Sequence, residues 1–167
     1  MSEPFLRPAV AEDCGLIAGW LSDPAINAML SSNLRGAQVS AQALMLGLRR
    51  RDQSWMLFAP DAAAMPAGLI ALDSVDTVDG IANLWFLLGT RDFGGRGLTS
   101  AAIARFCRDN PAGLHVLTAW IVDGNTASVR CLEKAGFHPA GRIEQGVAFA
   151  GGRRDRILMQ RIVGTMR

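Results

Sequence analysis

The feature that most restricts the fold is a glycine-rich turn between a buried strand and a helix. Residues 91–106 read RDFGGRGLTSAAIARF, so three glycines lead directly into apolar residues at helical spacing. The apolar run IANLWFLLG comes before this turn, and the buried strand HVLTAWIV follows the helix after the stop signal NPAG. Strand, turn, helix and strand within about 40 residues predict one right-handed crossover with parallel flanking strands.

The segments before this unit predict helices followed by an antiparallel meander. FLRPAV is typical of a strand, and Pro24 divides the next apolar pattern into helices over Glu12–Leu21 and Pro24–Leu30. VSAQALMLGLRRR predicts a third helix that ends in cations, which suit the C-terminal helix dipole. Three apolar runs separated by turn residues predict the meander: SWMLFAP, AGLIALDSV and IANLWFLLG.

The segments after the crossover predict one more helix and a closing hairpin. DGNTASVRCLEKAGF is typical of a helix with its cap at Asn125 or Thr126 and its stop at Gly136. The last two strands are expected to join across Gly151 and Gly152. The whole pattern predicts a mixed sheet of about seven strands that is not doubly wound.

The composition is that of one domain over residues 1–167. Half of the residues are hydrophobic and 19% are charged, which is an ordinary balance for a folded soluble chain. The apolar runs fall short of the roughly 18 residues that a membrane span needs. MSEPFLRP lacks the basic-then-apolar order of a signal peptide, so a cytoplasmic location without membrane contact is expected.

Charge and cysteine content argue against three other classes. The net charge of +2 is too small to indicate nucleic-acid binding, and the arginines within residues 49–51 and 153–156 resemble solvated ends of elements. The three cysteines form no CxxC pair, so a disulfide framework is not expected. With only two histidines besides, a metal site is not expected either.

The glycine turn has the properties of an anion site. Unpaired amides at a helix start, reached closely because of the glycines, suit a diphosphate, although a tight turn with nothing bound is the alternative. A P-loop is excluded because Leu98 follows the last glycine, where a lysine is required. A dinucleotide fingerprint fits only in part, because Asp123 lies farther from Gly95 than the usual distance of about 20 residues.

Two motifs together resemble the GNAT superfamily of N-acetyltransferases. NTASVRCLEKAGF has the superfamily's asparagine, a small residue three positions later, and the glutamate-lysine-x-glycine-phenylalanine ending. The turn resembles the superfamily's acetyl-CoA pyrophosphate loop, and the order of elements agrees over essentially the whole chain. The resemblance implies an α/β (α+β) fold whose mostly antiparallel seven-stranded sheet has a central splayed parallel pair and four to five flanking helices. It also implies a single acetyl-CoA-dependent N-acetyltransferase domain.

The resemblance places acetyl-CoA at the C-terminal ends of the parallel strands. Leu84–Leu88 and Val116–Val122 would splay apart there, and the pantetheine arm would pair with strand backbone in the gap. No metal is implied, and no covalent enzyme intermediate is needed, because direct transfer to the amine in a ternary complex depends mainly on positioning and desolvation. The expected cofactor-binding residues come from the first strand, the turn and the next helix: Leu87, Leu88, Gly94, Gly95, Arg96, Gly97, Leu98, Thr99, Asn125 and Ser128.

Three positions depart from the superfamily pattern. Gly94 replaces an arginine or glutamine and Thr99 replaces a glycine or alanine, so phosphate binding would depend more on backbone amides and the Thr99 hydroxyl. Leu132 stands where many members carry the tyrosine that protonates the thiolate, and the chain has no tyrosine. This resembles the branch that acetylates ribosomal-protein N-termini at alanine or serine. Ser128 is therefore expected beside the thiolate, with Cys131, a water, or a purely packed Ser128 as alternatives.

The carboxylate that would accept the amine proton is less defined. IANLWFLLG offers Asn83 but no glutamate, so the superfamily's familiar carboxylate on this strand is missing. Glu144 on the first hairpin strand is the catalytic candidate, and Asp73 and Asp155 are the competing carboxylates. A surface position for each, or a base that acts through water, is the alternative.

The acceptor pocket is implied between the early helices and the closing hairpin. Trp20, Asp23 and Asn27 are its expected substrate-binding residues, with Asp23 placed to attract an ammonium group. Met29 and Trp55 are further candidates for its walls, although both residue types are more often core. Glu133 and Lys134 are expected to form a local structural pair rather than part of the site.

Three functions compete. The leading hypothesis is acetyl transfer to a protein N-terminus or a small amine such as an amino sugar, by a monomer or homodimer. The second is a catalytically degenerate acyl-CoA-binding sensor, favoured by the missing tyrosine and glutamate. The third, a nicotinamide-dependent reductase, would need dinucleotide binding.

Overall fold

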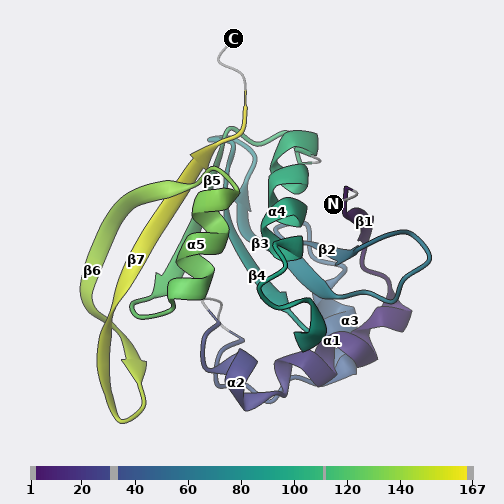
Figure 1. Cartoon of the computed structure of the whole chain (residues 1–167), viewed down its shortest axis with the longest axis horizontal. Coiled ribbons are helices and arrows are strands. Elements are labelled where there is room, and N and C mark those ends of the chain that lie inside the picture. Colours follow the sequence, from purple (N-terminus) through teal and green to yellow (C-terminus); the bar gives the residue numbers. More distant parts are fainter. Residues whose placement is uncertain (1–2, 31–33, 111, 165–167) are drawn as a thin grey trace.

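The computed structural model describes residues 3–30, 34–110 and 112–164, which form a seven-stranded sheet with helices on both faces (Figure 1). The strand order is β1-β2-β3-β4-β5-β7-β6, and every neighbouring pair is antiparallel except β4 and β5. The expected mixed sheet with one central parallel pair is therefore confirmed. The strands are β1 (Phe5–Pro8), β2 (Ser54–Ala59), β3 (Gly68–Asp76), β4 (Ile81–Leu88), β5 (Val116–Val122), β6 (His138–Phe149) and β7 (Gly152–Ile162).

Within the described residues, five α-helices and two short 3-10 turns connect these strands. Across the described ranges, none of the helices has the length and apolar character needed to cross a bilayer. The helices are α1 (Cys14–Leu21), α2 (Pro24–Asn27), α3 (Ala41–Gly47), α4 (Leu98–Asp109) and α5 (Thr126–Lys134), and the 3-10 turns are η1 (Ala11–Asp13) and η2 (Arg91–Phe93).

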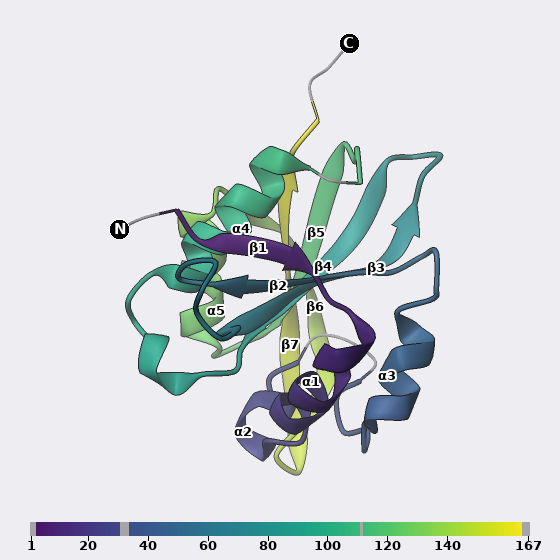
Figure 2. The same ribbon diagram turned by 90° about the vertical axis from the view of Figure 1, so that its right-hand side faces the viewer.

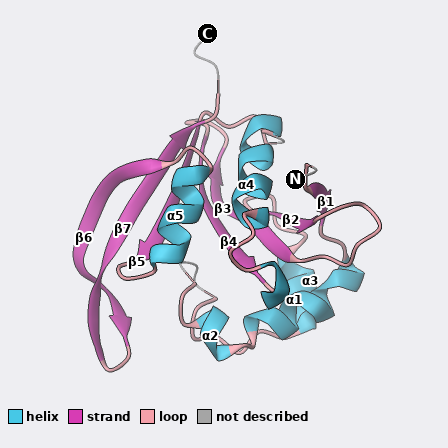
Figure 3. Cartoon of the chain, viewed as in Figure 1, coloured by secondary structure: helices cyan, strands magenta, loops and turns pink. Residues whose placement is uncertain are grey.

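Two apolar clusters hold helices on opposite faces of the sheet (Figure 3). On one face, α4 and α5 pack over side chains that include Leu84 and Ala119. On the other face, α1 and α3 cover Trp55 and Trp85, whose rings meet edge to face with centroids 6.3 Å apart. Because alternate residues of β4 enter opposite clusters, both faces of the meander are buried.

Helix ends differ from the expected ones by a few residues. α1 begins at Cys14 because η1 precedes it, and α2 ends at Asn27 rather than Leu30. α3 ends at Gly47, so the arginines at 49–51 lie beyond its last turn. The left-handed Asn110 ends α4, whereas Pro111 of the expected stop signal lies outside the described residues.

The closing hairpin turns one residue earlier than expected. Ala150 and Gly151 both have positive φ, and Gly152 already pairs with Phe149. Two central residues with positive φ are the geometry of a tight hairpin turn whose twist matches its strands.

β4 and β5 form a fork because their pairing stops early. Only Ile81, Ala82 and Asn83 pair with β5, through Val116, Leu117 and Thr118. Residues 84–88 of β4 remain bonded to β3, and residues 119–122 of β5 remain bonded to β7, while the two strands separate from each other. The splayed parallel pair is therefore present, and it opens toward the glycine turn that follows β4.

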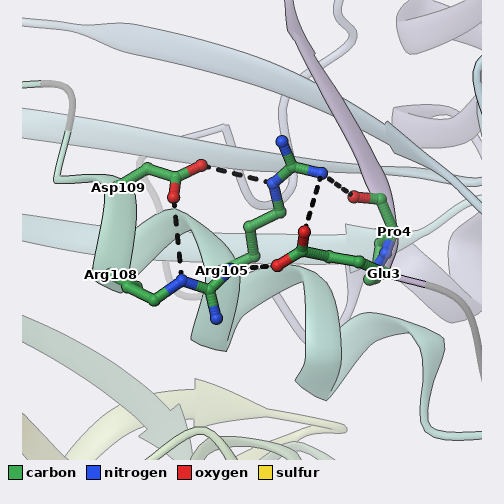
Figure 4. A network of polar contacts seen from close by, with 5 residues as sticks. All are labelled: Glu3, Pro4, Arg105, Arg108 and Asp109. Atoms are coloured by element: carbon green, nitrogen blue, oxygen red, sulfur yellow. Dashed lines mark hydrogen bonds and ion pairs between the residues drawn. The ribbon is translucent and has the colours of Figure 1, made fainter.

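A network of ion pairs fastens the beginning of the chain to α4 (Figure 4). Arg105 donates to the Pro4 carbonyl at 2.7 Å and lies 3.7 Å from Glu3, which also accepts a hydrogen bond from Arg108. Asp109 pairs with Arg105 at 3.2 Å. Because Pro4 directly precedes β1, this network holds the edge of the sheet against the helix that begins at the glycine turn.

Arg7 and Asp13 tie β1 to the start of α1 in the same way. Two guanidinium nitrogens of Arg7 donate to the two Asp13 oxygens at 2.7 Å, and the Val10 N–H donates to Asp13 at 2.9 Å. The Arg7 hydrogen bonds lower the pKa of Asp13, although its burial opposes this. The carboxylate is nearly buried, so its charge depends on these donors.

We predict that Asp13→Asn lowers the free energy of unfolding at pH 7 by about 2 kcal/mol, because hydrogen bonds to a buried charge are lost. Since the folded pKa lies below the unfolded value, this contribution is present above the unfolded pKa. It is lost as pH falls through the folded pKa. Urea unfolding at several pH values tests this. Asp52→Asn, which breaks the exposed pair with Arg50, is the matched control and should cost less than about 1 kcal/mol. Equal costs for the two variants would contradict the prediction.

Candidate functional site

A cavity of about 530 Å³ lies at the open end of the fork, between β4, the glycine turn and α5. Its wall is apolar along β4 and along the residues of α2 and the segment after it, and polar along the turn and α5. The lining residues are Ile26, Met29, Leu30, Phe86, Leu87, Leu88, Phe93, Gly94, Gly95, Gly97, Thr99, Ser100, Asn125, Ala127, Ser128, Arg130, Cys131 and Lys134.

The glycine turn presents unpaired backbone donors to this cavity. Gly95 has φ of 71° and Gly97 has φ of 78°, and Gly97 caps the start of α4. Within the described residues, the N–H groups of Gly95 and of residues 97–100 donate to no protein acceptor. Several amides that converge on one cavity at a helix N-terminus form an anion site.

Two of the expected turn residues do not line the cavity with their side chains. Arg96 is exposed and lies outside the lining, and Leu98 is buried in the core under α4. Thr99 does line the cavity, as do the glycines at 94, 95 and 97. The phosphate-facing surface is therefore made of backbone and the Thr99 side chain.

α5 contributes the polar wall through residues that share one helical face. Asn125 caps the helix by accepting from the Ser128 N–H at 3.2 Å. Ser128 and Cys131 line the cavity one turn apart, whereas Leu132 is fully buried against the sheet. Burial raises the pKa of Cys131 to about 12, so its sulfur is a neutral thiol at physiological pH.

Arg130 and Lys134 line the same cavity, and we did not expect them from the sequence. They are the charged side chains of the lining, which contains no carboxylate within the described part of the chain. Glu133 and Lys134 form no ion pair across the described residues, so the expected local pair was wrong. The helical spacing from Ala127 to Arg130, Cys131 and Lys134 was the available signal.

The three expected acceptor residues hold α2 in place and do not line the cavity. Trp20 packs so closely on Gly89 that a Cβ there would lie 2.1 Å from its ring. Asp23 accepts from the Ala25 N–H at 2.8 Å and pairs with Arg91 at 2.9 Å, and these contacts lower its pKa. Ile26, Met29 and Leu30, which this framework positions, reach the cavity instead.

Asn27 organises the segment that follows α2. Its amide donates to the carbonyls of Leu21 and Leu34 at 3.0 and 3.3 Å, and its oxygen accepts from the Gly36 N–H at 2.6 Å. Every hydrogen-bonding group of this side chain is therefore used inside the protein.

The candidate carboxylates occupy three different environments. Glu144 is exposed on β6. Asp155 accepts from the Gln145 N–H at 2.8 Å and pairs with Arg142, and both contacts lower its pKa. Asp73 is half-buried beside the fork, and burial raises its pKa above the usual range.

Asp73 belongs to a polar row at the closed end of the fork. Asp73 on β3 is the cross-strand partner of Asn83 on β4. Asn83 in turn pairs with Thr118 on β5, and this is the last pair before β4 and β5 separate. The Asn83 amide donates to Asp73 at 2.9 Å, while the Asn83 oxygen is buried without a partner among the described residues. Because Leu84 and Ala119 face α4 and α5, this row lies on the opposite face of the sheet.

No metal site accompanies these groups: the described residues contain no cluster of three or more potential metal ligands.

The fold and the cavity together define an acyltransferase architecture, with a forked sheet and an amide-lined turn at its open end. The chain belongs to the acetyltransferase (GNAT) domain family, whose sequence profile matches residues 5–138. No curated protein sequence gave a significant match.

Solved structures of a bacterial enzyme share this fold. The spermidine N-acetyltransferase of Vibrio cholerae, in complex with CoA and spermine, superposes with a TM-score of 0.84 at 17% identity, over 97% of this chain and 96% of that one. A structure of glutamate-to-glutamine mutant forms of the spermidine/spermine N-acetyltransferase from Vibrio cholerae gives a TM-score of 0.81 at 18% identity, over 98% of this chain and 95% of that one. At these identities the likeness establishes the fold.

We predict that Gly97→Ala weakens acetyl-CoA binding about tenfold, because a side chain in the left-handed region costs about 1–2 kcal/mol and displaces the amides of the turn. Titration calorimetry measures the Kd. Gly151→Ala is the matched control, since Gly151 has the same φ of 78° at the hairpin tip, away from the cavity lining. Equal effects of the two substitutions on Kd would contradict the assignment of the turn.

Proposed function

We propose that this acetyl-CoA-dependent N-acetyltransferase moves the acetyl group directly to a primary amine, either a protein N-terminus or a small amine such as an amino sugar. The observation that carries the proposal is the fork, which opens beside an amide-lined turn and joins one cavity. Leu87 and Leu88 offer unpaired strand edge on the fork side, as the implied pantetheine contact requires.

The lining of the cavity fits acetyl-CoA. The amides of Gly95 and of residues 97–100, with the Thr99 side chain, would hold the pyrophosphate, as the resemblance to the superfamily implied. Arg130 and Lys134 supply positive charge on the facing wall. Asn125 and Ser128 would contact the pantetheine arm from α5. When bound, acetyl-CoA supplies an activated thioester, and the protein contributes position and exclusion of water.

Ser128 is the proposed partner of the leaving sulfur. Its side chain lines the cavity on the α5 face that looks across to β4, and Cys131 lies one turn away as a neutral thiol. Leu132 points into the core, so no side chain at that position replaces the missing tyrosine. The similarity to the ribosomal-protein branch rests on this leucine and on Ser128, and it stays a prediction, as do the cytoplasmic location and the oligomeric state.

The acceptor amine must lose a proton before it attacks. Asp73 is the carboxylate that the geometry favours, because it lies beside the fork on the face opposite α4 and α5. Glu144 stays the candidate from sequence, at an exposed position on the hairpin. Trp20, Asp23 and Asn27 are proposed to shape the acceptor side by holding α2 and the segment after it.

The second candidate function, an acyl-CoA-binding sensor, is favoured by the buried Leu132 and by the missing carboxylate on β4. A thiol-release assay with acetyl-CoA and a panel of amines separates the two. Enzyme activity releases free CoA in an amine-dependent way, whereas a sensor is stabilised by acetyl-CoA without thiol release.

We predict that Ser128→Ala lowers kcat by about 10-fold to 100-fold, with little change in the Kd of acetyl-CoA, because the leaving sulfur loses its polar partner. Cys131→Ala should have the smaller effect. Thr126→Ala, at an exposed position of α5 outside the cavity lining, is the control for helix stability. Unchanged turnover of Ser128→Ala with acetyl-CoA still bound would show that Ser128 is only a packed helix residue.

The rate of acetyl transfer should also depend on pH through the general base. If Asp73 accepts the proton, kcat/KM falls as pH is lowered through its raised pKa, because the carboxyl becomes protonated and cannot act as a base. The wild type and Asp73→Asn are compared with the same amine, so that the titration of the amine is common to both profiles. Asp73→Asn should lower kcat/KM by about 10-fold to 100-fold and remove the fall of kcat/KM at low pH. If Glu144→Gln removes this fall and Asp73→Asn does not, the sequence candidate is the base.

A further inference from the structure

The side of the fork that faces away from α4 and α5 is bordered by arginines. Arg156 on β7 lies over the ring of Trp120 at 5.0 Å. Trp120 alternates with Ala119 and Ile121, which face α4 and α5, so Trp120 faces the opposite side. Arg156 therefore stands beside the fork on the same face as the polar row that contains Asp73.

Two more arginines join this border from different segments. Arg154 stacks on the Phe149 ring at 4.0 Å and donates to the Asp123 carbonyl at 3.3 Å, at the end of β5. Arg35, from the segment after α2, lies 5.9 Å from the same ring and donates to the Ala148 carbonyl. We name Arg35, Arg154 and Arg156 the arginine rim.

Two carboxylates near the rim are committed to another arginine, while Asp73 interacts electrostatically with Arg156. Asp123 and Asp155 both pair with Arg142. In the described residues, no carboxylate lies within ion-pair distance of Arg35 or Arg154, whose partners are backbone carbonyls and an aromatic ring. Their charges are therefore not neutralised by the protein.

The rim lies where an acceptor would enter. The cofactor cavity is lined mainly by the glycine turn and α5, and Leu87 and Ile26 of the opposite apolar cluster also reach it, so the fork is accessible to an amine from the other face. There, α1 and α3 cover β2, β3 and β4, and their apolar cluster includes no residue of β5 or β7 (Figure 2). The uncovered approach therefore runs between the α2 segment and the hairpin, where Arg35 meets Ala148.

From this placement we propose that the acceptor is a primary amine whose molecule also carries a carboxylate or phosphate, which the arginine rim binds. This rests on the proposed acetyl transfer and names its acceptor class. Guanidinium groups bind both anions through paired hydrogen bonds. The same charges repel polycations, so this chain is not expected to share the spermine ligand of the Vibrio cholerae structure.

The test uses acceptor pairs that differ in charge. Glucosamine 6-phosphate is compared with glucosamine, and a tripeptide with two glutamates after its N-terminal alanine is compared with one carrying two lysines. Spermidine is a fifth acceptor. The anionic member of a pair should have a kcat/KM at least about 10 times that of its partner. A larger ratio for the glucosamine pair indicates a phosphate-bearing acceptor, and a larger ratio for the peptide pair indicates a carboxylate-bearing one. A preference for spermidine or for the lysine peptide overturns the proposal.

Variants connect the preference to the rim. Arg154→Gln and Arg156→Gln should each reduce the anionic-to-partner ratio by about 10-fold, while Arg156→Lys, which keeps the charge, should restore part of it. Arg153→Gln is the matched control, because this neighbouring arginine alternates to the other side of β7 and donates to the Gln145 carbonyl. A ratio that no rim variant changes overturns the proposal, provided that thermal unfolding shows the variants folded.

Failure of the proposed function is recognised separately. If no amine causes thiol release although acetyl-CoA binds, the transferase proposal fails. Calorimetry on the CoA-loaded protein then tests whether the arginine rim binds an anionic amine. Binding of an anionic amine that Arg154→Gln weakens supports it, and absence of such binding overturns it.

Discussion

The early end of pairing between β4 and β5 is the constraint on which the rest of the molecule depends. Three residues of each strand form a parallel ladder, and beyond Asn83 and Thr118 each strand keeps only its outer neighbour. Unpaired strand edges are normally a liability, because their N–H and C=O groups need partners. Here the outer ladders keep both strands in place while the gap between them opens to a cavity.

The surrounding elements complete this gap as a site. The crossover returns through the glycine turn, so the N-terminus of α4 points its free amides at the open end of the fork. α5 closes the facing wall with Ser128, Cys131 and two cations. The opposite face holds the polar row of Asp73 and Asn83 on one side and the arginine rim on the other. In the proposed function, the acyl donor binds on the side of the glycine turn and α5, and the acceptor enters from the side of the arginine rim.

Much of this was predictable from the sequence where the signal was local. The glycines before Leu98 predicted the turn, and Asn125 predicted the cap of α5, because backbone conformation and capping depend on a few neighbouring residues. Apolar runs separated by turn residues predicted the meander, and the two glycines at 151 and 152 predicted the hairpin turn to within one residue. The splayed pair of strands was predicted from the superfamily resemblance. The residues of one strand do not show where its pairing with a neighbouring strand ends.

The features of the site that the sequence did not predict depend on contacts between distant segments. Arg130 and Lys134 were missed because helical spacing shows which residues share a face but not what that face meets. Asp23 and Asn27 looked available for a substrate, and the structure uses them for a cap, an ion pair and loop carbonyls. The environment of Asp73 arises from its cross-strand partner Asn83, ten positions along the chain.

The central claim is that the fork itself receives the acyl donor. Hydrogen exchange of the backbone amides, with and without acetyl-CoA, measures this most directly. If the fork receives the donor, exchange slows in residues 84–88 and 94–100 when acetyl-CoA is present, and exchange at the hairpin tip around Gly151 stays unchanged. Unchanged exchange in both segments under saturating acetyl-CoA, or protection confined to another region, would contradict the central claim.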